Sequence, residues 1–320
     1  MRIVFMGTPD FATETLKALI ESTHEIVGVV TQPDKPKGRS GKLQETPVKE
    51  VALQYGLTVY QPERVRDPEF MQILRELAPD VIVVVAFGQI LSKEILTLPK
   101  YGCINVHASL LPKLRGAAPI QWSVIDGDPE SGVTIMQMDE GIDTGDMLLV
   151  KKYTLDAKET GGSLFDRLAA FGGPMVLEVL EQAQAGTLHP VPQKHEEHTY
   201  AKMLSKETGR IDFKQSAVQI ERLIRGLNPW PSAFAYLGDK TLKLWDADVV
   251  TSEQAAGEGI PQAEPGTIVS VTKENFLIQT GDGYLSVNEL QLSGKKRMET
   301  SAFLRGYALQ EGIRLSEKPM

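Results

Sequence analysis

The sequence predicts an α/β protein in which a mostly parallel sheet, as in nucleotide-binding folds, is followed by a small antiparallel β-barrel. Two observations predict the first part: a buried strand at 2–6 turns directly into an amphipathic helix, and 80–86 is a continuous apolar strand. A third predicts the barrel, because short strand-like segments separated by tight glycine turns fill the C-terminal part. A chain of 320 residues has room for both domains.

Composition is that of an ordinary globular protein. Hydrophobic residues make up 42% and charged residues 24%, and the longest apolar run, 81–87, is too short to cross a bilayer. The N-terminus lacks a signal-peptide pattern, and the single cysteine, Cys103, fits a reducing compartment, so a cytoplasmic location is expected. The net charge of −8 argues against a general nucleic-acid binder, so any contact with RNA must use local basic patches.

The first elements follow one another as strand, helix and strand. The turn 7–9 starts a helix, and the strand 25–31 completes a right-handed β-α-β unit. The Gly-x-Gly-x-x-Gly pattern is absent, so no dinucleotide site is predicted. Before the strand 80–86, the periodicity predicts helices at 48–55 and 69–77 and a short strand at 57–60.

The connection 32–47 is unusually long and rich in proline and glycine. Its basic residues are Lys35, Lys37, Arg39 and Lys42. Loops of this length without their own structure are usually functional or disordered. Composition alone leaves a functional loop and a solvated, flexible connection equally open.

The segment 103–107 is predicted to be a strand that presents two polar side chains. Side chains alternate along a strand, so Asn105 and His107 project side by side from its end, before a loop that Pro112 and Gly116 keep irregular. An amide donor next to an imidazole at the carboxyl end of a strand suits α/β chemistry. Two alternatives stay open here: a buried His and Asn satisfied by backbone groups, and a nucleophilic role for Cys103 in place of an apolar filler.

The next elements are a helix at 118–126, strands at 132–138 and 147–153, and a helix at 163–185 that Gly172-Gly173-Pro174 is expected to break. The loop 139–146 between the two strands carries four carboxylates. Their spacing does not select the one that faces His107, and loops of this composition are often only turns.

The segment 186–204, with two prolines and mixed charges, is interpreted as a linker between domains at 1–185 and 205–320. Its His195-Glu196-Glu197-His198 run lacks the i,i+4 spacing of helical metal sites, so no metal site is predicted. The second domain should hold a helix at 217–227 followed by five strands of the antiparallel barrel: 233–237, 241–245, 266–271, 276–280 and 284–290.

Three segments carry a specific resemblance to a known family. They are 105–112 (Asn-Val-His-Ala-Ser-Leu-Leu-Pro), 115–120 (Arg-Gly-Ala-Ala-Pro-Ile) and 141–146 (Gly-Ile-Asp-Thr-Gly-Asp). In these three segments the chain resembles the enzymes that use 10-formyltetrahydrofolate as a formyl donor. The resemblance begins at Met6, extends beyond Pro231 and so covers most of the chain.

The resemblance implies a Rossmann-like formyltransferase domain at 1–185, a linker at 186–204 and an OB-like barrel at 205–320 that assists tRNA binding. It implies three catalytic residues: Asn105, His107 and Asp143. The folate would be bound by Phe87, Gly88, Ser109, Leu110, Leu111 and Pro112. The tRNA would be bound by Lys35, Lys37, Arg39 and Lys42 of the long loop and by Lys206.

The implied reaction moves the formyl group of 10-formyltetrahydrofolate to the free amino group of initiator methionyl-tRNA, in translation initiation. Asn105 and a protonated His107 would stabilise the negative oxygen of the tetrahedral intermediate. Asp143 would keep His107 protonated and accept the proton of the amine. The reaction requires no metal and no covalent nucleophile, and the resemblance suggests a monomer.

Two other functions remain open at this stage. A formyltransferase acting on a small amine, such as glycinamide ribotide or an amino-sugar nucleotide, would share the same three residues. A non-catalytic RNA-binding module is the second, although the acidic total and the lack of an aromatic and basic stripe count against it.

Overall fold

A computed structural model describes residues 1–37 and 41–319, and their contacts divide the chain into two compact units. The first unit comprises Met1–Pro119, Glu130–Thr154 and Phe165–Ala201. The second unit comprises Ile120–Pro129, Leu155–Leu164 and Lys202–Met320.

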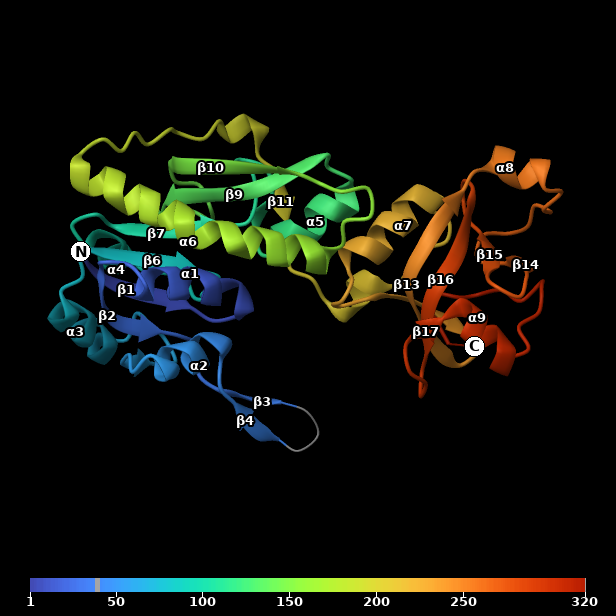
Figure 1. The fold of residues 1–320 in the computed structure, drawn as a ribbon, viewed down its shortest axis with the longest axis horizontal. Helices are drawn as coiled ribbons and strands as arrows, with labels where there is room; N and C mark the ends of the chain where they lie inside the picture. Colours follow the sequence, from blue (N-terminus) through green and yellow to red (C-terminus); the bar gives the residue numbers. More distant parts are fainter. Residues whose placement is uncertain (38–40, 320) are drawn as a thin grey trace. The chain divides into compact units, whose positions relative to one another are not determined.

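The first unit is built on a seven-stranded sheet with the order β10-β9-β7-β6-β1-β2-β5 (Figure 1). Five strands are parallel: β1 (Arg2–Gly7), β2 (Glu25–Val30), β5 (Val59–Tyr60), β6 (Val81–Val85) and β7 (Cys103–His107). Two antiparallel strands extend the sheet beyond β7: β9 (Glu130–Gln137) and β10 (Met147–Thr154). The predicted Rossmann-like, mostly parallel sheet is confirmed, and its strand order reverses between β1 and β6, where such folds bind ligands.

Helices cover both faces of this sheet because its strands are apolar on both sides. Side chains of α3 (Pro68–Leu77) and α4 (Lys93–Thr97), a short helix that the periodicity did not indicate, pack with Ile82 and Cys103 in one core cluster. The other face lies against α6 (Gly161–Ala185), whose Gly172 approaches Val106. The remaining helices of the β-α-β units are α1 (Asp10–Ile20) and α2 (Pro47–Gln54).

The expected break in α6 is wrong, because the helix continues through Pro174. Its glycines are needed for packing instead: a Cβ on Gly172 would lie 2.4 Å from Thr15 Oγ1, and one on Gly173 would lie 2.5 Å from Ala18 Cβ. The close contact with α1 helps to offset the hydrogen bond that Pro174 cannot donate.

The long connection 32–47 contains a hairpin of two short antiparallel strands, β3 (Lys35–Lys37) and β4 (Lys42–Gln44). Polar contacts hold its base to the first unit. Lys49 Nζ lies 2.6 Å from Asp34 Oδ2, Gln61 Nε2 donates to Asp34 Oδ1 at 2.6 Å, and the hydroxyls of Thr31 and Thr46 are 2.7 Å apart. The base of the hairpin therefore has a defined structure.

The predicted linker, 186–204, packs on the first unit as far as Ala201. It holds a 3-10 turn, η1 (His195–Glu197), and β11 (Tyr200–Ala201), which pairs in parallel with β8 (Arg115–Gly116). The short helix α5 (Pro119–Asp126) follows β8 in the chain.

The second unit contains an antiparallel sheet with the order β12-β13-β16-β15-β14, to which β17 is added beside β16. The strands are β12 (Ala233–Leu237), β13 (Lys240–Val250), β14 (Ile268–Val271), β15 (Phe276–Gln279), β16 (Tyr284–Leu292) and β17 (Met298–Glu299). The helix α7 (Ala217–Gly226), which a Ser216–Gln219 capping box begins, buries Ile220 and Ile224 in the same core. Shorter helical elements complete the unit: η2 (Lys206–Gly209), α8 (Ser252–Gly257) and α9 (Thr300–Gly306).

This sheet is open, so a closed barrel is not confirmed. Among the described residues no strand pairing joins the two ends of the sheet, β12 and β14. Isolated bridges instead connect each end to the C-terminal segment, from Tyr236 to Ser316 and from Thr267 to Arg314. The antiparallel character and the five expected strands are present.

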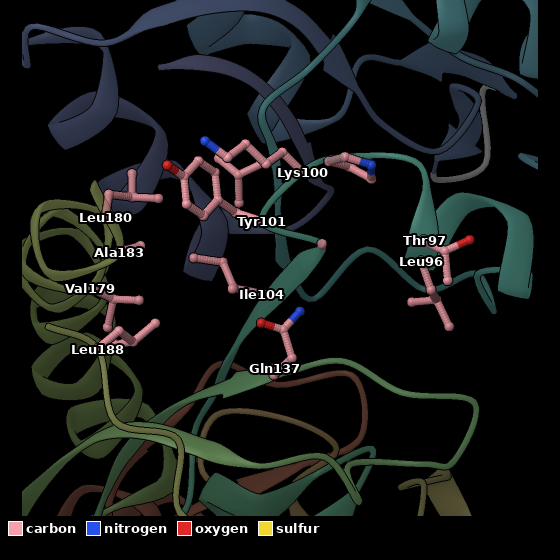
Figure 2. A pocket seen from close by; sticks show the side chains of 13 residues that line it. Leu96, Thr97, Lys100, Tyr101, Ile104, Gln137, Val179, Leu180, Ala183 and Leu188 are labelled. Carbon is pink, nitrogen blue, oxygen red and sulfur yellow. The ribbon is translucent and has the colours of Figure 1, made fainter. Parts of the chain in front are cut away.

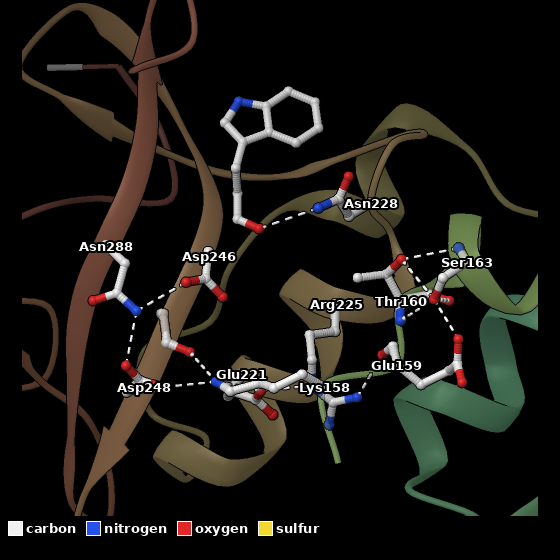
Figure 3. A network of polar contacts seen from close by, with 12 residues as sticks. Lys158, Glu159, Thr160, Ser163, Glu221, Arg225, Asn228, Asp246, Asp248 and Asn288 are labelled. Carbon is white, nitrogen blue, oxygen red and sulfur yellow. Dashed lines mark hydrogen bonds and ion pairs between the residues drawn. The ribbon is translucent and has the colours of Figure 1, made fainter. Parts of the chain in front are cut away.

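A polar network holds the segment Leu155–Leu164 within the second unit (Figure 3). Lys158 Nζ lies 2.6 Å from Asp248 Oδ1, and Arg225 Nη1 donates to the carbonyl oxygen of Glu159 at 2.7 Å. Asn288 Nδ2 in turn donates to the Asp248 carboxylate at 2.8 Å. This segment lies far from the rest of the unit in sequence, so the compact units are not contiguous stretches of chain.

None of the helices within residues 1–37 and 41–319 has both the length and the apolar character that crossing a membrane requires.

Candidate active site

Strand β7 brings Asn105 and His107 to the carboxyl edge of the parallel sheet, on the same side of the strand. His107 is buried and Asn105 is partly buried. Within the described part of the chain, the Asn105 side chain has no hydrogen-bond partner. Its amide therefore keeps both N–H groups for a ligand.

His107 has one ring nitrogen in use and one free. Nε2 donates to the carbonyl oxygen of Leu114 at 2.9 Å. Nδ1 lies 3.7 Å from Asp143 Oδ2, which is too far for a direct hydrogen bond. Nδ1 is therefore the ring nitrogen that faces the carboxylate and is not used by the backbone.

Asp143 has an unfavourable backbone conformation. Its φ of 53° lies in the left-handed region, which non-glycine residues seldom adopt. The backbone N–H of Gly116 donates to Oδ2 at 2.8 Å, and the side chain is 17% exposed. The neighbouring Asp139 serves the turn instead, since its Oδ1 accepts from Gly141 N–H and Thr144 Oγ1.

The loop that follows β7 is braced by Thr134, a fully buried residue that the sequence reasoning missed. Thr134 Oγ1 donates to the carbonyl oxygen of Ser109 at 2.7 Å and accepts from the N–H of Leu111 at 3.2 Å. The Ser109 hydroxyl donates to the Lys113 carbonyl at 2.6 Å. Of the expected folate-binding residues here, Ser109 and Leu111 are buried, whereas Leu110 and Pro112 are half-buried.

The expected folate-binding residues Phe87 and Gly88 follow β6, the strand next to β7. The carbonyl oxygen of Phe87 accepts from Thr8 Oγ1 at 3.0 Å and from Gln32 Nε2 at 3.2 Å, so this turn is tied to the ends of β1 and β2. Gly88 has a φ of 85°, which a side chain would make costly.

The turn continues into a cavity of about 360 Å³. Its lining residues are Arg64, Val65, Arg66, Gln89, Ile90, Leu91 and Ser92. Ile90 is 85% exposed, an unusual state for a large apolar side chain. The two guanidinium groups place positive charge at the cavity, and neither arginine stood out in the sequence.

The expected tRNA-binding residues fall in both units. Lys35 is exposed on β3, and Lys37 and Lys42 occupy partner positions of the hairpin strands. Arg39 lies outside the described residues. Lys206 is exposed at the start of η2 in the second unit.

A second cavity, of about 400 Å³, lies at the amino ends of β6 and β7, on the edge of the sheet opposite His107. Figure 2 shows Tyr101 and Ile104 on one side and Val179 and Leu180 of α6 on the other. No carboxylate or histidine is among its lining residues.

The described residues contain no group of three or more His, Cys, Asp or Glu side chains arranged to hold a metal ion. His195 of the His-Glu-Glu-His run instead contacts Arg115 Nη2 through Nδ1, at 3.1 Å. Cys103 is fully buried, and burial raises the pKa of its thiol to about 12. A thiolate nucleophile at this position is therefore disfavoured.

Comparison with known proteins gives consistent results. Residues 1–180 match the model of the formyl transferase family, and residues 203–308 match that of its C-terminal domain. The methionyl-tRNA formyltransferase of Lachnospira eligens is 59% identical over 317 residues, which cover 99% of this chain and 100% of that protein. Among solved structures, the sugar 3N-formyl transferase WlaRD, crystallised with dTDP and 5-N-formyl-THF, covers 92% of this chain and 99% of its own with a TM-score of 0.65 at 18% identity.

HypX from Aquifex aeolicus, solved in complex with tetrahydrofolic acid, covers 100% of this chain and 49% of its own, with a TM-score of 0.60 at 19% identity. At such identities the two structures support the fold alone, whereas the family model and the full-length relative decide membership. The chain belongs to the formyl transferase family.

Proposed function

We propose that this protein transfers the formyl group of 10-formyltetrahydrofolate to the free amino group of initiator methionyl-tRNA. The observation that carries the proposal is the convergence of a free Asn105 amide, His107 Nδ1 and the Asp143 carboxylate at one edge of the sheet. The acceptor is inferred from the relative that is 59% identical over the whole chain.

The amine nitrogen attacks the formyl carbon, and the formyl oxygen gains negative charge in the tetrahedral intermediate. Asn105 Nδ2 and a protonated His107 Nδ1 are the donors available to that oxygen, because Nε2 already donates to Leu114. The intermediate then collapses, breaking the bond from carbon to N10 of the folate, which takes up a proton.

The amine nitrogen must lose one proton after its new bond forms, and this balances the proton that N10 takes up. Asp143 is the proposed acceptor, directly or through one water, because only its Oδ2 is used by Gly116 N–H. The same carboxylate also faces His107 Nδ1, with its Oδ2 3.7 Å away.

The folate is proposed to lie along the ends of β6 and β7. Phe87, Gly88 and the loop Ser109–Pro112 supply backbone groups and apolar walls for the pterin ring. Arg64 and Arg66 would then face the carboxylates at the other end of the folate, across the cavity that they line. The site is thus suited to a co-substrate with a flat heterocycle and an anionic tail.

The tRNA is proposed to be held by the basic residues of the β3–β4 hairpin and by the second unit through Lys206. Support comes from their positive charge on a chain with a net charge of −8, and from the family C-terminal domain at 203–308. We also propose that the second unit is an OB-like barrel, in which the C-terminal segment bridges the two ends of the open sheet. The boundaries at 185 and 204, the monomeric state and the cytoplasmic location stay predictions.

The test is release of tetrahydrofolate from 10-formyltetrahydrofolate by the purified protein. Charged methionyl-tRNA should support release, whereas uncharged tRNA, glycinamide ribotide and an amino-sugar nucleotide should not. Release with one of the small amines would favour the small-amine formyltransferase, and tRNA binding without any release would favour the RNA-binding module.

A further inference from the structure

Arg115 is a buried basic residue on β8. The residue is 2% exposed, yet no carboxylate of the described residues forms an ion pair with its guanidinium group. Its Nε and Nη2 both donate to Gln193 Oε1, at 3.1 and 2.8 Å, and Nη2 also contacts His195 Nδ1. A buried cation is costly unless its hydrogen bonds are satisfied, so the contact with Gln193 is the main reason that it is tolerated.

Gln193 also forms hydrogen bonds with the loop that carries Asp143. The side chain is 5% exposed, and its Nε2 donates to the carbonyl oxygens of Asp143, at 2.9 Å, and Gly145, at 2.7 Å. Both ends of the amide are therefore fully used. A rotation of the amide by half a turn would place Oε1 against the two carbonyl oxygens and the NH2 group against Arg115. The contacts therefore fix the amide in one orientation.

Asp143 needs such support because its backbone is in the left-handed region, with a φ of 53°. Gln193 holds its carbonyl, and Gly116 N–H holds its carboxylate. Gly116 directly follows Arg115, and Leu114, on the other side of Arg115, accepts the hydrogen bond of His107 Nε2. One short segment thus holds both members of the reacting pair.

The predicted linker, 186–204, also holds the segment 114–117 through hydrogen bonds. Arg115 N–H donates to the Thr199 carbonyl at 2.9 Å, and Leu114 N–H donates to Thr199 Oγ1 at 2.9 Å. Ala117 N–H donates to the Ala201 carbonyl at 2.9 Å. Thr199 and Ala201 therefore support the site together with Gln193.

We propose that Arg115 and Gln193 are positioning residues that hold the Asp143 carboxylate at His107 Nδ1. The inference rests on the proposed function in one respect, that Asp143 and His107 are the reacting pair. It adds two residues that touch neither substrate and act through the Asp143 loop.

Gln193→Glu is the sharpest test because it keeps the shape of the side chain. A carboxylate would pair with Arg115, so the buried cation stays satisfied, but the two N–H donors to Asp143 and Gly145 are lost. Displacement of a reacting group costs up to about 10²-fold in rate, and kcat for methionyl-tRNA formylation should fall by about that factor. The KM for the folate should change little, whereas the melting temperature should fall, because two carbonyl oxygens lose their donors.

A double-mutant cycle with Asp143→Asn separates positioning from a general structural defect. If Gln193 acts through Asp143, Gln193→Glu should lower kcat about 10²-fold in the wild-type background and by less than about threefold beside Asp143→Asn. Equal losses on the two backgrounds would overturn the proposal. Lys194→Met, at the exposed neighbouring position, is the matched control and should leave kcat unchanged.

A second measurement does not depend on the substrate. The N–H of Gly116 donates to Asp143 Oδ2, so its hydrogen exchange reports whether the carboxylate is in place. Exchange should be at least about tenfold faster in Gln193→Glu and unchanged in Lys194→Met. Unchanged exchange in Gln193→Glu would overturn the proposal even if the wild-type protein failed to formylate methionyl-tRNA, an outcome that concerns the proposed function alone.

Discussion

The carbonyl oxygen of Leu114 accepts a hydrogen bond from His107 Nε2 at 2.9 Å, and this contact determines which ring nitrogen can react. A carbonyl only accepts, so Nε2 carries a proton whether the ring is neutral or charged. The proton that the ring gains or loses must therefore be on Nδ1, the nitrogen that faces Asp143. The carboxylate meets the imidazole at the position where the charge changes.

Asn105→Ala should lower kcat by about 10²–10³-fold, because one donor to the oxyanion is lost. The KM for the folate should change little, since this donor acts mainly in the transition state. The Asn105 side chain has no partner among the described residues, so the substitution leaves no buried group unsatisfied. Steady-state kinetics with methionyl-tRNA measure the effect, circular dichroism checks the fold, and a near-normal kcat would remove Asn105 from the mechanism.

Asp143→Asn should also lower kcat strongly, within the roughly 10²–10⁴-fold range of general acid–base groups. An amide oxygen still accepts from Gly116 N–H, so the loop keeps its shape while the charge that faces His107 is lost. Asp139→Asn is the matched control, because Asp139 lies in the same loop but serves its turn. Equal losses in the two variants would mean that the shape of the loop matters and the charge of Asp143 does not.

Cys103→Ala should keep its turnover within about threefold of the wild type. Burial raises the pKa of this thiol to about 12, so the neutral form persists in the folded protein through the physiological range. Iodoacetamide at pH 8 should therefore label Cys103 only after unfolding in urea. Loss of formyl transfer in Cys103→Ala with intact folate binding would support the thiol nucleophile instead.

Local patterns predicted the strands that carry the site. The alternation in 103–107 placed Asn105 and His107 at the end of β7, and the apolar run 80–86 predicted β6 nearly to the residue. The spacing of the loop carboxylates could not select one of them. Only the fold places Gly116 N–H against Asp143, a contact between residues 27 positions apart.

Other features were missed because their cause is non-local. Gln193 acts on a carbonyl 50 positions away, and nothing in its proline-containing neighbourhood distinguishes it from a solvated linker. Local propensity predicts a break in α6 at Pro174. The helix continues because Gly172 and Gly173 pack on α1, a contact that local propensity does not include. In both cases tertiary contacts decide the outcome.

Asp34→Asn should destabilise the folded protein at neutral pH and progressively less in acid. The hydrogen bond from Lys49 and that from Gln61 lower the pKa of Asp34 below its ordinary value of 3.8. Because the folded pKa is the lower one, the ionised carboxylate contributes stability above about pH 4 and loses it as the pH falls through the folded pKa. Urea unfolding of the variant and the wild type from pH 7 to pH 3 should show converging stabilities.

The matched control for this experiment is Asp239→Asn, in the exposed turn between β12 and β13. Its stability difference from the wild type should be small at every pH. A constant difference for Asp34→Asn down to pH 3 would mean that the Lys49–Asp34 contact does not fix the base of the hairpin.

The last prediction concerns the β3–β4 hairpin as the RNA contact of an otherwise acidic chain. Each phosphate contact that is lost should reduce the slope of log affinity against log salt by about 0.7–0.9. Lys35→Ala, on β3, and Arg39→Ala, at a position outside the described residues, should each weaken methionyl-tRNA binding and flatten this slope. Arg39→Lys should restore only part, because a planar guanidinium binds phosphate through two donors. Folate affinity should not change, and Lys100→Ala, at the opposite edge of the sheet, is the control. If affinity and slope stay as in the wild type for both hairpin variants, the hairpin is a solvated connection and the tRNA is held elsewhere.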